Sequence, residues 1–278
     1  MSSESDRYYH PSGAAPVGGL VKMFGIGLIV AVVASAISGL VAYYNPYIII
    51  SCLGPILCGA AIGATVQIAA NAGDVRSPAA SWGIGLLLGL VAVYSTWVVY
   101  LSLDGQLVYM PRAIWDLLEF NAHNGVWSLG EFTPTGWQLY LVWGIEAASI
   151  IAFAGVLAGA ATTTYCESCG CWTEKKIEHT LFEAASDRKA FKRDLEAERY
   201  DALSALNRAT DESPEVMETI VYCCPQCSES NFLSMNHTPM ETDKEGKRRK
   251  TATNAIVDNL KIPQNIVEQL AQPTAEAG

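Results

Sequence analysis

The sequence predicts a membrane-embedded, all-α four-helix bundle followed by a small cytoplasmic α+β domain of zinc-ribbon type. Four apolar runs are each long enough for the roughly 20-residue helix that crosses a bilayer. Two Cys-x2-Cys pairs follow the last of these runs. Charge also divides the chain, because residues 1–162 carry four basic and eight acidic residues, whereas the remaining 116 carry 14 and 20. A lipid-soluble part therefore precedes a water-soluble one.

The first part of the chain is expected to contain a disordered N-terminus and four spans. Residues 1–19 begin with a polar stretch that contains Pro and Gly, which is typical of disorder. No small-residue cleavage site closes the first apolar run, and further spans follow it, so an uncleaved anchor is favoured over a signal peptide. The spans are predicted at residues 20–42, 47–70, 82–103 and 138–162.

The positions of Lys and Arg predict the orientation. With the N-terminus inside the cell, the outside segments hold only Arg112, and the inside segments hold the other basic residues near the spans. These inside residues are Arg7, Lys22, Arg76, Lys175 and Lys176. We therefore expect both termini in the cytoplasm of a multi-pass protein of the cell (inner) membrane. Clustered thiols agree, because they are more often metal ligands than disulfides in a reducing compartment.

Three of the spans carry a Gly-x3-Gly spacing, which places two glycines on one helix face and allows helix backbones to approach closely. The pairs are Gly59/Gly63, Gly85/Gly89 and Gly155/Gly159. Packing within a monomeric bundle is favoured, and homo-oligomer contacts are the alternative. The external loop, residues 104–137, is expected to contain a short interfacial helix from Pro111 to Phe120. A ligand lid is the alternative for this loop.

The second part of the chain, residues 163–272, is predicted to be the zinc-ribbon domain. A helical insertion is expected at about 184–209, which is rich in Ala, Leu, Glu, Lys and Arg and lacks Gly and Pro. Strand-like segments flank the second cysteine pair, and a turn at 243–246 leads into a polar strand through Thr253. A short helix at 263–270 precedes the tail, residues 273–278.

The cysteines are the strongest candidate site. Two thiolate pairs, each separated by two residues, can form the four-sulfur tetrahedron that Zn²⁺ accepts. The predicted ligands are Cys166, Cys169, Cys224 and Cys227, with Cys171 and Cys223 as substitutes. Because all four positions are sulfur, the site should be closed, structural and non-catalytic. The nearby His179 and His237 are expected to be solvent-exposed.

Glu146 in the fourth span is the second candidate. A carboxylate in hydrocarbon costs a few kcal/mol, so it should face the bundle interior, form a pair or be protonated. It is interpreted either as an ion or proton site or as a protonated, hydrogen-bonded carboxyl between helices, and the second reading is favoured. Its expected neighbours are Ser38, Tyr94, Ser95, Thr96 and Ser149.

These features resemble uncharacterised bacterial multi-pass proteins that end in a zinc-ribbon-like domain. The resemblance lies in the four spans, the Trp-rich external loop, Trp-x2-Glu in the fourth span, and the motifs Tyr165-Cys-Glu-Ser-Cys169 and Cys224-Pro-Gln-Cys227. The two extra cysteines beside these motifs depart from the pattern. The resemblance implies an architecture and no activity.

We therefore expect a membrane protein whose zinc ribbon serves as a cytoplasmic docking or assembly module. The expected partners are the lipid bilayer, a protein bound through the C-terminal domain and a further copy of the chain. Nucleic acid is not expected, because residues 163–278 carry six more acidic than basic residues. A small channel or transporter using Glu146 is the alternative, and a thiol-redox protein using Cys-x2-Cys is a weaker one. The sequence contains no recognisable catalytic motif, so an enzyme is not expected.

Overall fold

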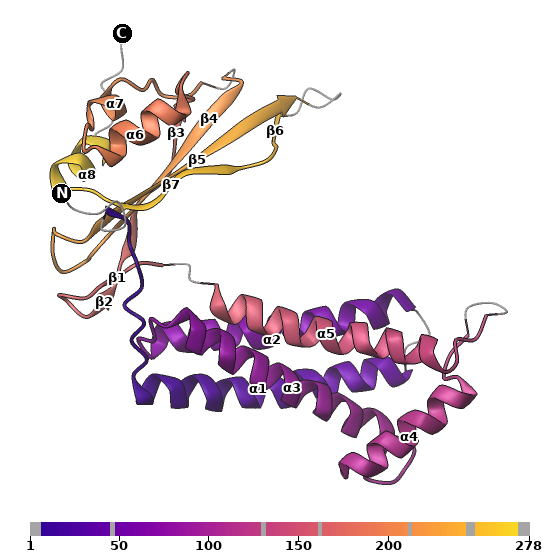
Figure 1. Cartoon of the computed structure of the whole chain (residues 1–278). Coiled ribbons are helices and arrows are strands. Elements are labelled where there is room, and N and C mark those ends of the chain that lie inside the picture. Colours follow the sequence, from indigo (N-terminus) through magenta and orange to yellow (C-terminus); the bar gives the residue numbers. More distant parts are fainter. Residues whose placement is uncertain are drawn as a thin grey trace. The chain divides into compact units, whose positions relative to one another are not determined.

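A computed structural model describes residues 7–44, 48–128, 132–160, 163–210, 213–242 and 248–271. The chain divides into two compact units, shown in Figure 1. Ser12–Ala161 form one, which we call the helical unit. Met1–Pro11 and Thr162–Gly278 together form the other, which we call the cysteine unit.

The helical unit contains four helices that are long and apolar enough to cross a membrane, which indicates a membrane protein. They are α1 (Val17–Tyr44), α2 (Ile48–Ala72), α3 (Pro78–Ser102) and α5 (Trp137–Gly159), and they overlap the four predicted spans. Helix α3 begins where the Ser77 hydroxyl accepts a hydrogen bond from the Ala80 N–H and Pro78 occupies the first turn. Exposed apolar side chains such as Ile29, Leu57 and Ile145 face outward.

Close backbone contacts hold these helices together. A methyl group added at Gly59 would lie 2.5 Å from the Ile150 carbonyl oxygen, and one added at Gly85 would lie 2.5 Å from that of Ala154. Both carbonyls belong to α5. Gly63 and Gly89 also meet the backbone of α5, whereas Gly155 and Gly159 of α5 meet mainly side chains of α3. The glycine pairs are therefore used for packing within the helical unit, which was the favoured prediction.

A shorter helix, α4 (Pro111–Asn124), lies in the connection between α3 and α5 and extends the helix predicted to end at Phe120. Its Ile114 side chain is buried, and the Trp115 ring stacks on Tyr140 of α5 at a centroid distance of 6.2 Å. Gly125 ends the helix in a left-handed conformation, with φ of 77°, and its N–H donates to the Asn121 carbonyl.

The cysteine unit is built on an antiparallel sheet. In the described residues the sheet order is β3-β4-β5-β6, and β7 also pairs with β5. The strands are β3 (Glu174–Glu183), β4 (Glu215–Cys223), β5 (Asn231–Thr242), β6 (Arg248–Lys250) and β7 (Asn254–Lys261). A separate hairpin pairs β1 (Tyr165–Cys166) with β2 (Cys171–Trp172).

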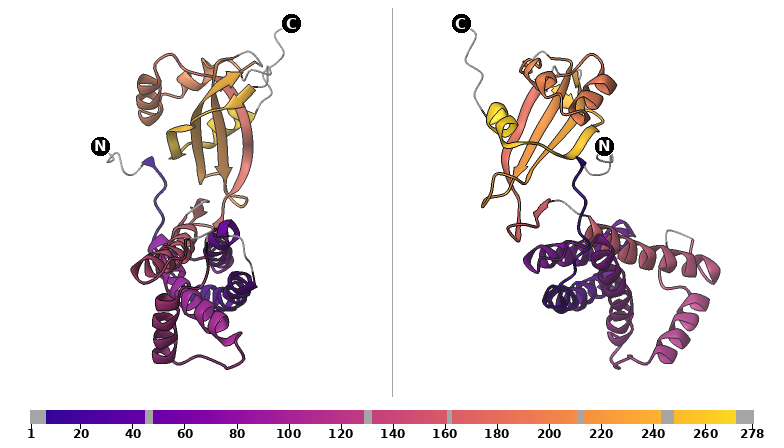
Figure 2. Two further views of the ribbon diagram at one scale, coloured as in Figure 1. Left: turned by 90° about the vertical axis from the view of Figure 1, so that its right-hand side faces the viewer. Right: turned by 60° about the vertical axis from the view of Figure 1, so that its left-hand side comes forward.

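Three short helices pack against this sheet, as Figure 2 shows. They are α6 (Arg188–Glu196), α7 (Asp201–Ser204) and α8 (Gln264–Ala271). Buried Phe191 and Leu195 of α6 and Val267 of α8 join Met217 and Leu233 of the sheet in one core. This apolar core holds in place the strands that carry the second cysteine loop.

The region expected to be a helical insertion, residues 184–209, differs from the prediction. It holds two short helices in place of one long helix, because the chain turns after α6, where Glu198 adopts a left-handed conformation with φ of 60°. The strand β7 was not predicted, and the polar strand expected through Thr253 is limited to β6. The expected turn at 243–246 and the tail 273–278 lie outside the described residues.

The expectation of a disordered N-terminus over residues 1–19 does not hold for residues 7–19. The Tyr8 hydroxyl donates to Glu196 Oε1 at 2.6 Å, and the Tyr9 N–H donates to the Asn259 carbonyl at 2.9 Å. The Tyr9 ring also packs edge-on against Phe232, and α1 already begins at Val17. Two tyrosines thus attach the polar segment to partners that lie more than 180 residues later in the chain.

Candidate metal centre

The first cysteine pair lies in a tight hairpin between β1 and β2. In this hairpin Cys166 pairs with Cys171, and Tyr165 pairs with Trp172. Gly170 adopts a φ of 67°, which favours glycine, and its N–H donates to the Cys166 carbonyl at 2.9 Å. The hairpin therefore presents Cys166 and Cys169 from one short loop.

The second pair lies in the loop that connects β4 to β5. Cys223 pairs with Asn231 at the end of the ladder, and the Cys224 N–H donates to the Ser230 carbonyl at 3.0 Å. The buried Asn231 side chain donates to the Ser228 carbonyl at 2.8 Å and so braces the loop from within. This bracing role of Asn231 was not predicted.

Sheet pairing brings the two loops together although residues 170–223 separate them. Strand β3 begins two residues after β2 and pairs with the end of β4, where Glu174 lies opposite Cys223. The intervening chain runs away from the first cysteine loop along β3 and back toward the second along β4. The antiparallel pairing of these two strands therefore places the two cysteine loops next to each other despite their long separation in sequence.

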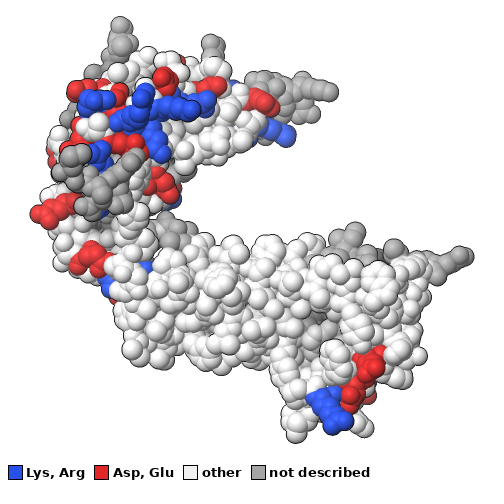
Figure 3. Space-filling model, in the orientation of Figure 1, with Lys and Arg blue, Asp and Glu red and all other residues white. Residues whose placement is uncertain are grey.

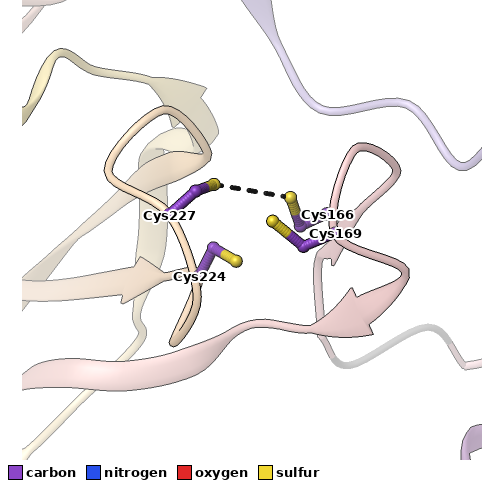
Figure 4. Close-up of side chains that lie close together, drawn as sticks. All are labelled: Cys166, Cys169, Cys224 and Cys227. Carbon is purple, nitrogen blue, oxygen red and sulfur yellow. Dashed lines mark hydrogen bonds between the residues drawn. The ribbon is translucent and has the colours of Figure 1, made fainter.

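The four predicted ligand sulfurs form one cluster. The Sγ atoms of Cys166, Cys169, Cys224 and Cys227 all lie within 4.8 Å of one another, and Figure 4 shows them converging from the two loops. Cys166 Sγ and Cys227 Sγ lie 3.8 Å apart. A regular tetrahedron with Zn–S bonds of about 2.3 Å has an edge of about 3.8 Å. The donor set and the spacing therefore fit a metal ion of this kind.

The polar surroundings favour thiolates in the second loop. Burial acts to raise the pKa of Cys224, but hydrogen bonds from the N–H groups of Gln226 and Cys227 and from the Cys171 and Cys227 side chains together lower this pKa to about 6. The N–H groups of Glu229 and Ser230 likewise lower the pKa of Cys227. Across the cluster, the Ser230 hydroxyl donates to Cys166 Sγ at 3.1 Å. Because a metal binds the thiolate form, these donors prepare the site for a cation.

The two extra cysteines occupy different positions. Cys223 is buried in the hydrophobic core with Met217 and Val221, and the alternation of a strand directs it away from its neighbour Cys224. Cys171 lies at the edge of the cluster, with its Sγ 3.6 Å from that of Cys224. Burial and the contact with Cys224 raise the pKa of Cys171 to about 11. Cys171 is thus the nearer of the two predicted substitutes.

The prediction that His237 is solvent-exposed is wrong. His237 is 2% exposed, because it lies opposite Met217 of the core in the β4–β5 ladder, and its ring lies between two charged groups. Its Nδ1 is 2.7 Å from Arg188 Nη1, and its Nε2 is 3.0 Å from Glu215 Oε2. The ring therefore joins α6 to β4 and is not a metal ligand. The side chain of His179 lies outside the described residues.

Glu146, the other predicted site residue, lines a cavity of about 100 Å³ in the helical unit. Of its predicted neighbours, Ser38 and Thr96 line the same cavity. Tyr94 instead donates to the Tyr109 carbonyl, and Ser149 donates to the Ile145 carbonyl. The prediction missed the aromatic lining, which comprises Trp97, Tyr100, Trp127 and Trp143.

No protein-family model, curated protein sequence or solved structure matches this chain. The resemblance to bacterial multi-pass proteins with a zinc-ribbon-like end is therefore supported only by the four apolar helices and the cysteine cluster.

Proposed function

We propose that the cysteine unit is a zinc-stabilised docking or assembly module carried by a membrane anchor. The observation that supports this most directly is the convergence of four cysteine sulfurs within 4.8 Å from two separate loops. A module of this kind uses its metal to hold loops in place and uses its surface to bind a partner.

Zinc is the metal that this donor set suits best, with iron as the other ion that four thiolates commonly bind. Cys166, Cys169, Cys224 and Cys227 would hold it. Bound there, the ion would crosslink the β1–β2 hairpin to the β4–β5 loop, and four thiolates would leave no coordination position for a substrate. A metal with no open coordination position has a structural role and cannot bind a substrate for catalysis.

The cysteine unit is proposed to lie in the cytoplasm. It contains residues from both ends of the chain, since Tyr8 and Tyr9 attach to it directly. Four spans separate these two ends, and an even number of crossings returns the chain to the side from which it started. The bias of Lys and Arg toward the segments on this side favours the cytoplasm.

The surface beside the second cysteine loop supports a docking role. An open cleft of about 750 Å³ is lined by the loop together with Lys175, Lys176, Glu229 and Gln264. Figure 3 shows that basic and acidic side chains gather on the cysteine unit, whereas those on the visible face of the helical unit are mostly confined to α4. A protein segment with charges of both signs would suit this cleft.

Photo-crosslinking in cells tests the proposal on the full chain. A crosslinking residue at the exposed Gln226, beside the cleft, should capture one discrete protein, and the same residue at exposed Lys189 on α6 should not. Cys224→Ser should remove the Gln226 product, because the loop loses its metal. A Gln226 product of undiminished yield in Cys224→Ser would contradict a metal-dependent docking module.

A further inference from the structure

The cavity that contains Glu146 lies among the ends of several helices of the helical unit. Its lining includes the start of α2 (Gly54 and Pro55), the end of α3 (Thr96 and Tyr100) and the start of α5 (Trp143 and Glu146). The segment that follows α4 adds Val126 and Trp127. This end of the spans is opposite the one at which Gly73 packs on Gly19. The metal cluster belongs to the other unit, so the cavity is independent of it.

Aromatic rings wall this cavity. Trp97 and Trp143 meet edge to face, with centroids 5.1 Å apart and planes at 81°. Tyr100 packs against Trp97 in the same manner at 5.8 Å. Trp and Tyr are common at membrane interfaces, where they anchor helices in the headgroup region.

Exposure distinguishes the cavity rings from such anchors. Trp82, Trp115 and Trp137 are 50%, 59% and 72% exposed, as anchors facing the surroundings would be. Trp97 and Trp143 are only partly exposed and line the cavity instead. These two rings are therefore positioned to contact something held inside the helical unit.

Glu146 places a carboxyl group in the wall of this cavity. The described residues provide this carboxyl with no hydrogen bond and no ion pair. The one basic residue within the four long helices is Lys22 of α1, and its Nζ approaches the Ala72 carbonyl at the far end of α2. A carboxylate at membrane depth is costly without a partner, so a cationic ligand would relieve this cost.

We propose that this cavity binds an ammonium group that carries small apolar substituents, of the methylammonium class. Indole and phenol faces attract such cations through their π electrons, and a carboxylate adds direct charge attraction. A hard metal ion is disfavoured, because Ca²⁺ takes 6–8 oxygen ligands. Here only Glu146, Ser38 and Thr96 contribute polar side chains to the lining apart from the aromatic residues.

The size of the cavity agrees with this ligand class. Its volume of about 100 Å³ is of the same order as the roughly 150 Å³ of an apolar cavity that accepts benzene, and a trimethylammonium group is similar in size to benzene. A trimethylammonium or ethylammonium head is the scale of group that fits. Such a head can belong to a soluble amine or to a lipid headgroup, and the two sources share the chemistry that the cavity recognises.

Binding to the purified full chain tests the proposal. The chain is placed in nanodiscs of phosphatidylglycerol, and choline or tetramethylammonium is titrated while tryptophan fluorescence and heat are recorded. Both probes should bind saturably. The neutral isostere 3,3-dimethylbutan-1-ol should bind at least about tenfold more weakly, because it lacks the charge that the rings and Glu146 recognise.

Variants locate the binding. Glu146→Gln should weaken choline at least about tenfold, whereas Glu119→Gln on the exposed face of α4 should leave it unchanged. Ala147→Leu adds bulk to the cavity wall and keeps the Glu146 carboxylate, and it should abolish the binding of choline. Thermal unfolding of each variant shows whether it is folded. If Glu146→Gln does not fold, Ala147→Leu still tests whether the cavity is the binding site.

The lipid composition of the nanodisc distinguishes the two possible sources of the ammonium group. If phosphatidylethanolamine or phosphatidylcholine in the nanodisc lowers the apparent affinity for tetramethylammonium, a headgroup occupies the cavity. An unchanged affinity assigns the cavity to a soluble amine, and both results support the proposal. Equal binding of the neutral isostere, unaltered binding by Glu146→Gln, or no binding of either cation in phosphatidylglycerol would overturn it.

Discussion

The two units of this chain bury their interiors by different means. In the helical unit, glycine and alanine faces bring backbones together, and large apolar side chains such as Ile29 and Leu57 point outward. In the cysteine unit, large side chains such as Met217 and Leu233 fill the core and charged residues cover the surface. In lipid, the hydrophobic effect contributes little to helix association, so close van der Waals packing must hold the helices together. In water, the hydrophobic effect stabilises the core of the cysteine unit.

A second difference concerns the two groups of functional side chains. The cysteine sulfurs converge from two loops, and the metal proposed to bind them would crosslink these loops. Glu146 and its aromatic neighbours instead belong mainly to helices that the glycine contacts hold in place. The comparison predicts that metal removal disturbs one unit and leaves the other intact.

The largest expected effect is that of removing a ligand. Cys224→Ser should lower the zinc content of the purified chain from about one ion to near zero, because the roughly 10–16 kcal/mol of structural zinc binding in small zinc domains depends on the complete ligand set, and the variant lacks one of four thiolates. Cys223→Ala is the matched control next to it and should retain the zinc, since Cys223 packs in the core. Elemental analysis of both variants measures this.

Cys171 is tested in the same way. Cys171→Ser should keep the zinc, and Cys169→Ser should lose it. The reverse result would show that Cys171 replaces Cys169 as the fourth ligand.

Acidification should release the metal without unfolding the helical unit. The pKa of Cys224 is lowered to about 6 and that of Cys227 is also lowered, so their thiolates stabilise the folded form. This contribution is complete above the ordinary thiol pKa and is lost as the pH falls through about 6. Bound metal competes with protons and moves release lower still. A chromogenic chelator followed from pH 8 to pH 4 should report release below about pH 6, and release above pH 7 would argue against four thiolate ligands.

A change at the contact between α3 and α5 should act only on the helical unit. Gly85→Ala places a methyl group 2.5 Å from the Ala154 carbonyl oxygen and should destabilise the unit by about 1–3 kcal/mol. Gly83→Ala on the same helix meets nothing within 4 Å and should be neutral or stabilise by up to about 1 kcal/mol, since alanine favours helix. Unfolding in mixed detergent micelles measures both, and equal effects would refute the assigned contact.

The smallest expected effect lies in the cysteine unit, at the start of α6. Asp187 Oδ1 accepts hydrogen bonds from the N–H groups of Lys189 and Ala190, at 3.0 and 2.9 Å. Asp187→Ala should cost about 1 kcal/mol, and Asp187→Asn should cost much less because asparagine caps equally well. Chemical denaturation measures both, and the zinc content should not change in either variant.

Features that depend on a local pattern were predictable from the sequence. The four apolar helices follow from run length, and the short helix α4 follows from Pro111 and its apolar face. The four clustered cysteines follow from two Cys-x2-Cys spacings. Each helix and each cysteine pair is encoded by a few neighbouring residues, whereas the convergence of the two pairs also requires the β3–β4 ladder.

Features that depend on distant partners were not predictable. Strand β7 is ordered by its pairing with β5, and Tyr8 by contacts with Leu260 and Glu196. The burial of His237 requires Arg188, which lies 49 residues earlier. The rings around Glu146 were visible as single tryptophans, but only helix packing places them in one cavity.

Hydrogen exchange of the full chain with and without a zinc chelator tests the central claim most directly. The amides of residues 165–172 and 224–230 should lose their protection when the metal is removed. Those of α1, α2, α3 and α5 should exchange as before, because glycine packing holds them. Unchanged protection of both cysteine loops in metal-free protein would contradict the account, since the cluster would then be ordered without an ion.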